Sequence, residues 1–517
     1  MTRAQARQWN GNVAHAGIGR TMAAPTAICR KKCVLNRMTT TASAPGQRSL
    51  PTCCLTTALL TNKEHAMKRR HFLQLMAATG MTAHMPLWTP KAHAAAAPDQ
   101  FLVVVNASGG WDPTSLCDPK GLNSAYEAQS DRYLGSTNSV DLDPAKAFGN
   151  IRWSAIPSYV SNDEAVLLRV ESQFDQFFNT YGNRLTVING IDTGTNNHDT
   201  GNRVIWSGKE EIGYPSLSAY FAAATGPTLP MAFISNGGYD FTDSLVARAR
   251  ASNANFINEL ADPNRYSGDR GFLFRTSDRS IDQYSAVVAA QKARLQRQQQ
   301  QEALPLRRQQ LSQLFGVRSE DSNLGQLSVS LADIKANVSR DSHWNANRSN
   351  SLKSQAEVVT AAFQSGLAAS ANLNIGGFDT HGNHDSNAYP QLGDLLEGIH
   401  FLQAALQYAG IANRTTVVVG SDFGRTPYYN SGNGKDHWPV TSMMVLHPNS
   451  TGGKVFGAST SDYHAQPLNR STGLADASGD KLTPAHVNQA LRKLLGVDQS
   501  PLNSNYPLRV NDFDIFA

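Results

Sequence analysis

The chain has 517 residues, of which 40% are hydrophobic and 17% are charged, as in soluble globular proteins. Its net charge of +5 is unevenly distributed: residues 1–97 hold 13 Lys and Arg against one acidic residue, which leaves 33 basic and 40 acidic residues in 98–517. An acidic body argues against a nucleic-acid-binding protein, which needs a basic face. Cys117 is the one cysteine after residue 67, so the body is not expected to form an internal disulfide.

Residues 67–97 have the organisation of an export signal. A basic run at 68–70 is followed by a weakly apolar stretch at 75–88 and by small residues at 92–94. This order is typical of secretory signals, and paired arginines are typical of twin-arginine signals. We therefore expect the twin-arginine machinery to export the protein to the periplasm or the medium of a bacterium. We expect residues 1–66 to be a disordered upstream extension that is not native. No later stretch reaches about 18 consecutive apolar residues, so no membrane anchor is expected.

Beyond residue 98, short apolar runs predict buried strands. They are three to five residues long, are often β-branched and end near Gly, Asn or Asp, as strands covered on both faces do. These runs lie at 101–105, 185–188, 231–234, 373–375, 415–419 and 443–446. Apolar spacing predicts a helix over 392–406, and Thr483 and Pro484 begin another that stops at Gly496. The order predicts an α/β domain over 98–517 with a central, mostly parallel sheet flanked by helices.

One long segment has a different composition. Residues 281–315 are rich in Gln, Arg, Ala and Leu, and no strand is predicted from Ser280 to about Leu373. We expect a mainly helical insertion over about 241–368. Pro305 should divide it into at least two helices.

Three predicted strands end in nearly the same motif, Gly-Gly-aromatic-Asp, at 109–112, 237–240 and 376–379. Ligands of open α/β sheets bind at the carboxyl ends of the strands, where glycines allow tight turns and a carboxylate can face the crevice. Any single copy is also explained by ordinary turn chemistry, in which Asp is common. Together the motifs predict an acidic site at this edge.

Metal-ligating residue types gather in three further segments. Residues 379–385 hold four potential ligands in seven positions, 421–427 hold an aspartate directly after a strand, and 435–439 hold adjacent aspartate and histidine. Mixed Asp and His ligands suit zinc, manganese or similar divalent ions. The pattern predicts a metal site built from distant parts of the chain.

In this order, the motifs at 109–112, 376–381, 421–427 and 434–439 resemble the domain-of-unknown-function 1501 family, whose members are sulfatase-like proteins of the alkaline phosphatase superfamily. The resemblance spans 98–517 and implies an alkaline-phosphatase-like fold with divalent metal ions, such as zinc, manganese or calcium, at the strand ends. The metal ligands that it implies are Asp112, Asp379, His381 or His384, Asp422 and His437.

The resemblance also implies a nucleophile at the start of a helix, and there this chain departs from the family pattern. Family members often have Ser-His where this chain has Asn197 and His198, and an amide is not a nucleophile. Thr195 or Thr200 could substitute, or water could attack. The candidate catalytic residues are therefore Thr195, His198 and Arg425, with Arg425 bracing a phosphate or sulfate group.

Two functions compete. The first is an exported metal-dependent hydrolase of phosphate or sulfate esters, acting on a small-molecule or polymeric substrate. The second is a catalytically degenerate exported binding protein on the same fold, which Asn197 and the replacement of a His by Phe423 after Asp422 would favour. A purely structural secreted protein leaves the clustered ligands unexplained.

Overall fold

The computed structural model describes residues 98–120, 146–251, 281–304, 307–308, 311, 324–339, 350–450 and 452–517. The chain divides into two units, Met1–Leu87 and Trp88–Ala517, and every described residue belongs to the second. The predicted export signal and the extension before it lie outside the described residues. Among the residues described, no helix has both the length and the apolar character needed to cross a membrane.

An eight-stranded sheet forms the centre of the described unit, with the strand order β12-β4-β11-β8-β1-β7-β5-β6. Its strands are β1 (Phe101–Ala107), β4 (Leu185–Asp192), β5 (Phe233–Ser235), β6 (Arg248–Ala249), β7 (Ser370–Ile375), β8 (Thr415–Gly420), β11 (Val440–Leu446) and β12 (Lys454–Phe456). β11 runs antiparallel to both of its neighbours, and the other pairs are parallel. The predicted mostly parallel sheet is confirmed, and each predicted apolar run lies in or overlaps one of these strands.

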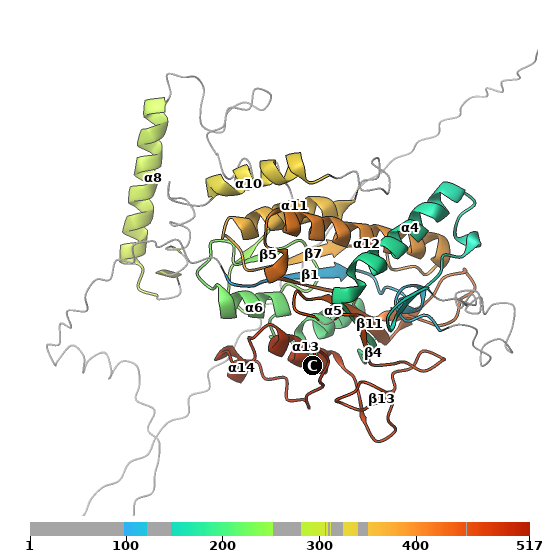
Figure 1. Cartoon of the computed structure of the whole chain (residues 1–517). Coiled ribbons are helices and arrows are strands. Elements are labelled where there is room, and N and C mark those ends of the chain that lie inside the picture. The colour runs from blue at the N-terminus through green and yellow to red at the C-terminus, as the bar shows by residue number, and fades with distance from the viewer. Residues whose placement is uncertain are drawn as a thin grey trace, which may run out of the picture. The chain divides into compact units, whose positions relative to one another are not determined.

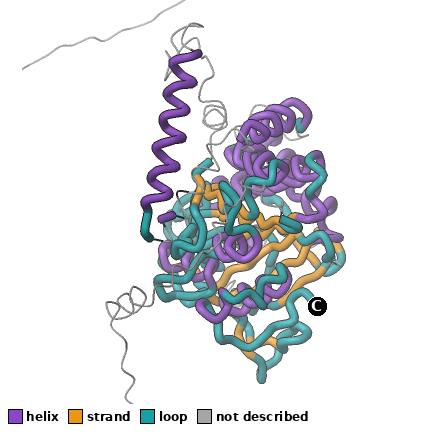
Figure 2. Tube along the Cα trace, turned by 90° about the vertical axis from the view of Figure 1, so that its left-hand side faces the viewer, coloured by secondary structure: helices purple, strands orange, loops and turns teal. Residues whose placement is uncertain are grey.

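Helices cover both faces of this sheet (Figure 1). The covering helices are α4 (Glu164–Tyr181), α5 (His198–Ser207), α6 (Leu217–Thr225), α10 (Leu324–Asn337), α11 (Ser351–Gln364), α12 (His384–Tyr408) and α13 (Pro484–Leu494). The unit also contains α8 (Ile281–Gln301), whose described side chains are mostly exposed, and the short helix α14 (Leu502–Asn505). One apolar cluster joins the sheet to α4, α10, α11 and α12, and a second joins it to α5, α6 and α13. The Cα trace in Figure 2 shows helices on either side of the strands, as expected for an α/β fold.

Alternation along β1 explains why the sheet is buried on both sides. Phe101, Val103 and Val105 belong to the first apolar cluster, whereas Leu102 and Val104 belong to the second. Successive side chains of a strand point to opposite faces, so a continuous apolar run fits a strand between two helical layers.

Three two-stranded sheets and several short 3-10 helices complete the described unit. The paired strands are β2 (Lys146–Phe148) with β3 (Ile151–Trp153), β9 (Gly424–Arg425) with β10 (His437–Trp438), and β13 (Pro467–Leu468) with β14 (Asp480–Lys481). The 3-10 helices are Pro113–Ser115, Ser158–Val160, Gly182–Arg184 and Ala412–Arg414. The β9–β10 pair carries two of the predicted site residues, Arg425 and His437.

The predicted helical insertion at 241–368 is only partly described. Its described residues contain the helices α8, α10 and α11 and the two-residue strand β6. α11 is part of the layer that covers the sheet, because its Phe363 stacks on Phe101 of β1 with ring centroids 4.6 Å apart. For the residues that lie outside the described ranges, the insertion stays a prediction.

Candidate metal centre

Three loops that carry predicted ligands leave the sheet at neighbouring positions. β8, β1 and β7 are adjacent and parallel, and Asn106 of β1 pairs with Gly420 on one side and Asn374 on the other. The loops after these strands therefore start at the same edge. Asp112 follows β1, Asp379 follows β7 and Asp422 follows β8.

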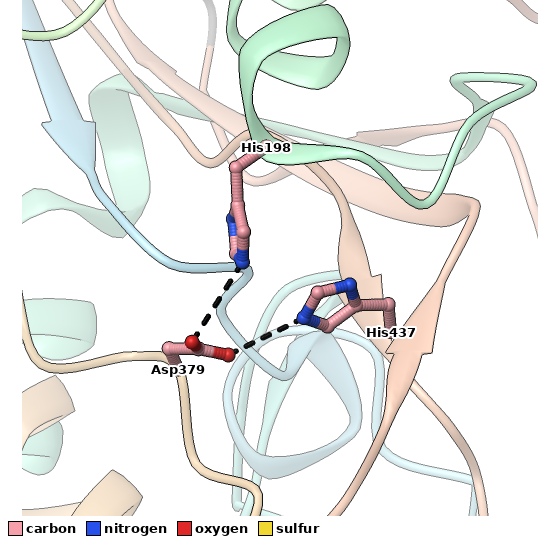
Figure 3. Close-up of side chains that lie close together, drawn as sticks. All are labelled: His198, Asp379 and His437. Carbon is pink, nitrogen blue, oxygen red and sulfur yellow. Dashed lines mark hydrogen bonds and ion pairs between the residues drawn. The ribbon is translucent and has the colours of Figure 1, made fainter. Parts of the chain in front are cut away.

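Two histidines from elsewhere in the chain meet the Asp379 carboxylate at this edge (Figure 3). His198 is the first residue of α5, and its Nε2 lies 3.7 Å from Oδ2 of Asp379. His437 lies in β10, and its Nε2 is 3.3 Å from Oδ1 of Asp379. One ligand atom from each of the three residues lies within 4.8 Å of the others, which is close enough for all three to contact one ion.

A third histidine joins this group. Nε2 of His381 lies 3.1 Å from Oδ1 of Asp379 and 2.9 Å from Nε2 of His437. We call His198, Asp379, His381 and His437 the ligand cluster. Of the two nearby histidines of the sequence motif, His381 lies in this cluster and His384 lies in a different group of residues, with Asp112 and Lys435.

The Nδ1 atoms of His437 and His381 are each hydrogen-bonded to an oxygen atom. Nδ1 of His437 lies 2.7 Å from the backbone oxygen of Asn196, and Nδ1 of His381 lies 3.0 Å from Oδ1 of Asp436. A carbonyl or an ionised carboxylate only accepts hydrogen bonds, so each Nδ1 carries the proton that it donates. In a neutral imidazole this leaves Nε2 with a free lone pair directed into the ligand cluster.

His198 is held in the same way by a buried carboxylate. Its Nδ1 lies 2.5 Å from Oδ2 of Asp422, which is fully buried. Oδ1 of Asp422 accepts the backbone N–H groups of Gly109 and Gly110 at 3.2 and 2.6 Å, and the hydroxyl of Ser421 at 2.8 Å. The structure thus places Asp422 behind His198, where metal-binding histidines commonly have a carboxylate partner.

Phe423 packs against the imidazole rings of His198 and His437. It is fully buried, and its ring centroid lies 4.7 Å from that of His198 and 4.5 Å from that of His437. Phe423 is the residue at which the sequence departs from the family pattern. The contact gives this departure a structural role, because the apolar ring limits the rotation of both imidazoles.

Arg425 orients Asp379. The guanidinium is fully buried and donates to Oδ1 of Asp379 at 2.6 Å, to the backbone oxygen of Lys435 at 2.9 Å and to that of Gly110 at 2.8 Å, and also to that of Gly109. Burial by itself raises the pKa of Asp379, but the hydrogen bond and the charge of Arg425 outweigh it and hold that pKa below its ordinary value. Asp379 is therefore ionised at neutral pH.

Asp112 and His384 form a separate, buried group with Lys435. Oδ2 of Asp112 lies 2.7 Å from Nζ of Lys435 and 3.1 Å from Nε2 of His384. Burial raises the pKa of Asp112, but the charge of Lys435 and the hydrogen bonds with His384 and Lys435 outweigh it and hold the pKa well below its usual range. Burial also lowers the pKa of His384, so its imidazole is neutral. These two predicted ligands are not part of the ligand cluster.

Thr195 and Asn197 belong to the turn that starts α5. The Asn197 side chain accepts the backbone N–H of Thr200 at 3.1 Å and so caps the helix, as Asn commonly does. The Thr195 hydroxyl accepts the backbone N–H of Asn197 at 3.2 Å. Both residues therefore stabilise the turn that presents His198 to Asp379.

Sequence reasoning assigned no individual role to three contributors to this site. Asp436 and Lys435 directly precede His437, and their charged side chains next to a predicted ligand were a usable signal. Asn196 acts through its backbone oxygen, which no side-chain pattern could reveal. His198 was considered only as a catalytic residue, although the structure places it among the ligand atoms.

The family model described as protein of unknown function (DUF1501) matches residues 99–505. The chain belongs to the DUF1501 family. The match covers all four residues of the ligand cluster as well as Asp422 and Lys435. No curated protein matches the DUF1501 chain in sequence.

Several solved structures resemble the DUF1501 chain. The lipoteichoic acid synthase LtaP from Listeria monocytogenes is 8% identical, with a TM-score of 0.30 and coverage of 78% of this chain and 74% of that chain. PsFucS1 sulfatase from Pseudoalteromonas sp. is 9% identical, with a TM-score of 0.30 and coverage of 78% and 69%. The phosphonate monoester hydrolase of Agrobacterium radiobacter is 9% identical, with a TM-score of 0.26 and coverage of 77% and 74%. At these values the similarities assign no role to any residue.

Proposed function

We propose that this DUF1501 protein is an exported, metal-dependent hydrolase of phosphate or sulfate esters. One observation carries the proposal: the Nε2 atoms of His381 and His437 face each other at 2.9 Å while each Nδ1 is bonded to an oxygen acceptor. Two lone pairs at this distance repel each other, and either a metal ion bound by both nitrogens or a proton on one Nε2 removes the repulsion. With the nearby Asp379 carboxylate, they form a donor set that fits a divalent ion.

Imidazole ligands favour zinc over calcium, because calcium prefers oxygen donors. A divalent ion held by the ligand cluster would supply Lewis-acid stabilisation of negative charge on an ester oxygen. The residues around it set the geometry in advance: Arg425 holds Asp379, and Asp422 holds His198. The side chains of Asp379 and His381 are about half exposed, so a substrate can reach this edge of the sheet.

A second candidate is a catalytically degenerate binding protein on the same fold. The capping role of Asn197 favours it, because the side chain at the start of α5 is an amide engaged with the backbone and supplies no hydroxyl nucleophile. Such a protein would retain the ion but not turn over esters. The composition of residues 67–97 supports export by the twin-arginine machinery for both candidates.

The test is metal content followed by ester hydrolysis. We expect the purified full-length protein to contain a divalent ion and to hydrolyse aryl phosphates or aryl sulfates, and Asp379→Ala to lose both properties. The matched control is Asp240→Ala, which alters the same Gly-Gly-aromatic-Asp motif after β5. Asp240 bonds to Ser235, Arg248 and Arg250 instead of metal-ligating side chains, so this variant should keep its ion. Bound metal without turnover on either ester would support the binding protein, and a protein without metal would contradict both.

Removing the negative charge of Asp422, which bonds Nδ1 of His198, should lower the affinity for the ion. Asp422→Asn keeps the side-chain volume but loses the carboxylate that accepts the Nδ1 proton, and loss of such a partner typically costs about 10–100-fold in metal affinity. Competition with a zinc chelator measures the change. Asp514→Asn is the control, because Asp514 is an exposed aspartate of the C-terminal segment. An unchanged affinity in Asp422→Asn would show that His198 is not a ligand.

A further inference from the structure

The carboxylate of Asp112 is saturated by hydrogen bonds from the protein. Oδ1 accepts the backbone N–H and the hydroxyl of Thr114 at 2.9 and 2.7 Å. Oδ2 accepts from Ser115 Oγ at 2.9 Å, His384 Nε2 at 3.1 Å and Lys435 Nζ at 2.7 Å. A carboxylate offers about four lone-pair positions, and five donors already point at this one. A metal ion could bind Asp112 only by displacing them.

Lys435 fills the space next to Asp112 where such an ion would bind. Its side chain is fully buried, and its Nζ lies 3.3 Å from the Thr114 hydroxyl and 5.1 Å from the ring centroid of Tyr429. A carboxylate, a hydroxyl and an aromatic face together surround the ammonium group. Tyr429 is itself fixed, because its hydroxyl donates to the Asp385 carboxylate at 2.8 and 2.9 Å.

We propose that the Lys435 ammonium takes the place of a metal ion beside Asp112 and His384, so that the part of the chain that the structure describes binds a single divalent ion, at the ligand cluster. This inference rests on the proposed function, because it takes the ligand cluster as the site of that ion. A second divalent cation beside Asp112 would bring like charges together in a buried space, at a large electrostatic cost.

Lys435 is also a positioning residue for the ligand cluster. Its backbone N–H donates to the oxygen of Thr380 at 3.0 Å, and its backbone oxygen accepts from Arg425 at 2.9 Å. These main-chain bonds tie the segment that carries Asp436 and His437 to Thr380 and Arg425. They do not involve the side chain of Lys435 or Asp112, so they stay in place when either side chain is replaced.

The number of bound ions tests the inference. Equilibrium dialysis of the full-length protein against zinc or manganese, read by elemental analysis, should give one ion per chain in the wild type. Asp112→Asn should also bind one ion with unchanged affinity, because the amide oxygen can still accept from Lys435 and no ligand is lost. Asp379→Asn should bind none. If Asp112→Asn does not fold, the double variant Asp112→Leu with Lys435→Met, which replaces the pair by apolar groups, should still bind one ion.

The outcomes separate this inference from the proposed function. Two ions per wild-type chain, or loss of the ion in Asp112→Asn or in the folded double variant, would overturn the role given to Lys435 but leave a metal-dependent enzyme. A wild type without any ion would remove the proposed function and this inference together. One ion in the wild type and in the Asp112 variants, with none in Asp379→Asn, supports both.

Discussion

Replacing Lys435 with methionine is expected to lower the free energy of unfolding by about 3–5 kcal/mol, because it leaves the Asp112 carboxylate buried without its charge partner. Urea denaturation followed by circular dichroism measures this loss. The double variant with Asp112→Leu should recover only part of it, because it removes the unpaired buried charge but leaves the donors of Thr114, Ser115 and His384 without their acceptor. Lys493→Met is the control: its ion pair with Asp512 is about half exposed, so the change should be about 0–1 kcal/mol.

The free energy of unfolding lost in Lys435→Met should depend on pH. In the wild type the pKa of Asp112 is lower in the folded than in the unfolded state, so its stabilising contribution is complete above an unfolded pKa of about 3.9 and is lost progressively as pH falls from there through the folded pKa. Without Lys435, burial should instead raise the pKa of Asp112, and protonation then relieves the penalty. The difference between wild type and Lys435→Met should shrink as pH falls towards about 4. A difference that grows with acidity would contradict this assignment.

Gly109→Ala is expected to disrupt the ligand cluster. Gly109 has φ +119°, and a Cβ added there would lie 2.6 Å from the backbone nitrogen of Asp379. Backbone strain of this kind costs about 1–3 kcal/mol, and the clash with main-chain atoms must also displace Asp379. Both the free energy of unfolding and the metal affinity should therefore fall, as denaturation and metal titration can measure.

A neighbouring glycine provides the control for this substitution. Gly376 lies at the end of β7 in the equivalent motif, but its φ is not in the left-handed region and a Cβ added there would have no neighbour within 4 Å. Gly376→Ala should keep its ion and unfold like the wild type. If both variants bind metal normally, the close approach of the two strand-end loops does not position Asp379.

Much of the fold could be read from short stretches of sequence. The run at 101–105 predicted β1, and 415–419 predicted β8, because a continuous β-branched run suits a strand between two helical layers. The helix predicted over 392–406 extends back to His384 in α12, and its first turns escaped notice because Pro390 interrupts the pattern. The helices α4, α5 and α6 were not predicted individually.

The grouping of the site residues was much harder to predict. Asp112 and Asp379 follow strands with the same motif. Arg425 and three histidines surround Asp379, whereas Lys435 forms an ion pair with Asp112. Sequence spacing could not separate these cases, because Arg425 lies 46 residues from Asp379 and Lys435 lies 323 residues from Asp112 along the chain. Arg425, predicted to brace a substrate, is fully buried and bonded to main-chain oxygens and Asp379, and its direct role in catalysis stays a prediction.

Local sequence was therefore enough for the strands, for the polar turns at their ends and for the types of side chain that gather there, because these depend on interactions over a few residues. Tertiary structure alone decided that His381 joins His437 while His384 joins Asp112, three positions further along the same segment. The physical reason is that a ligand set depends on which strand ends lie side by side and on how the loops above them turn. Long-range packing of the whole sheet determines both.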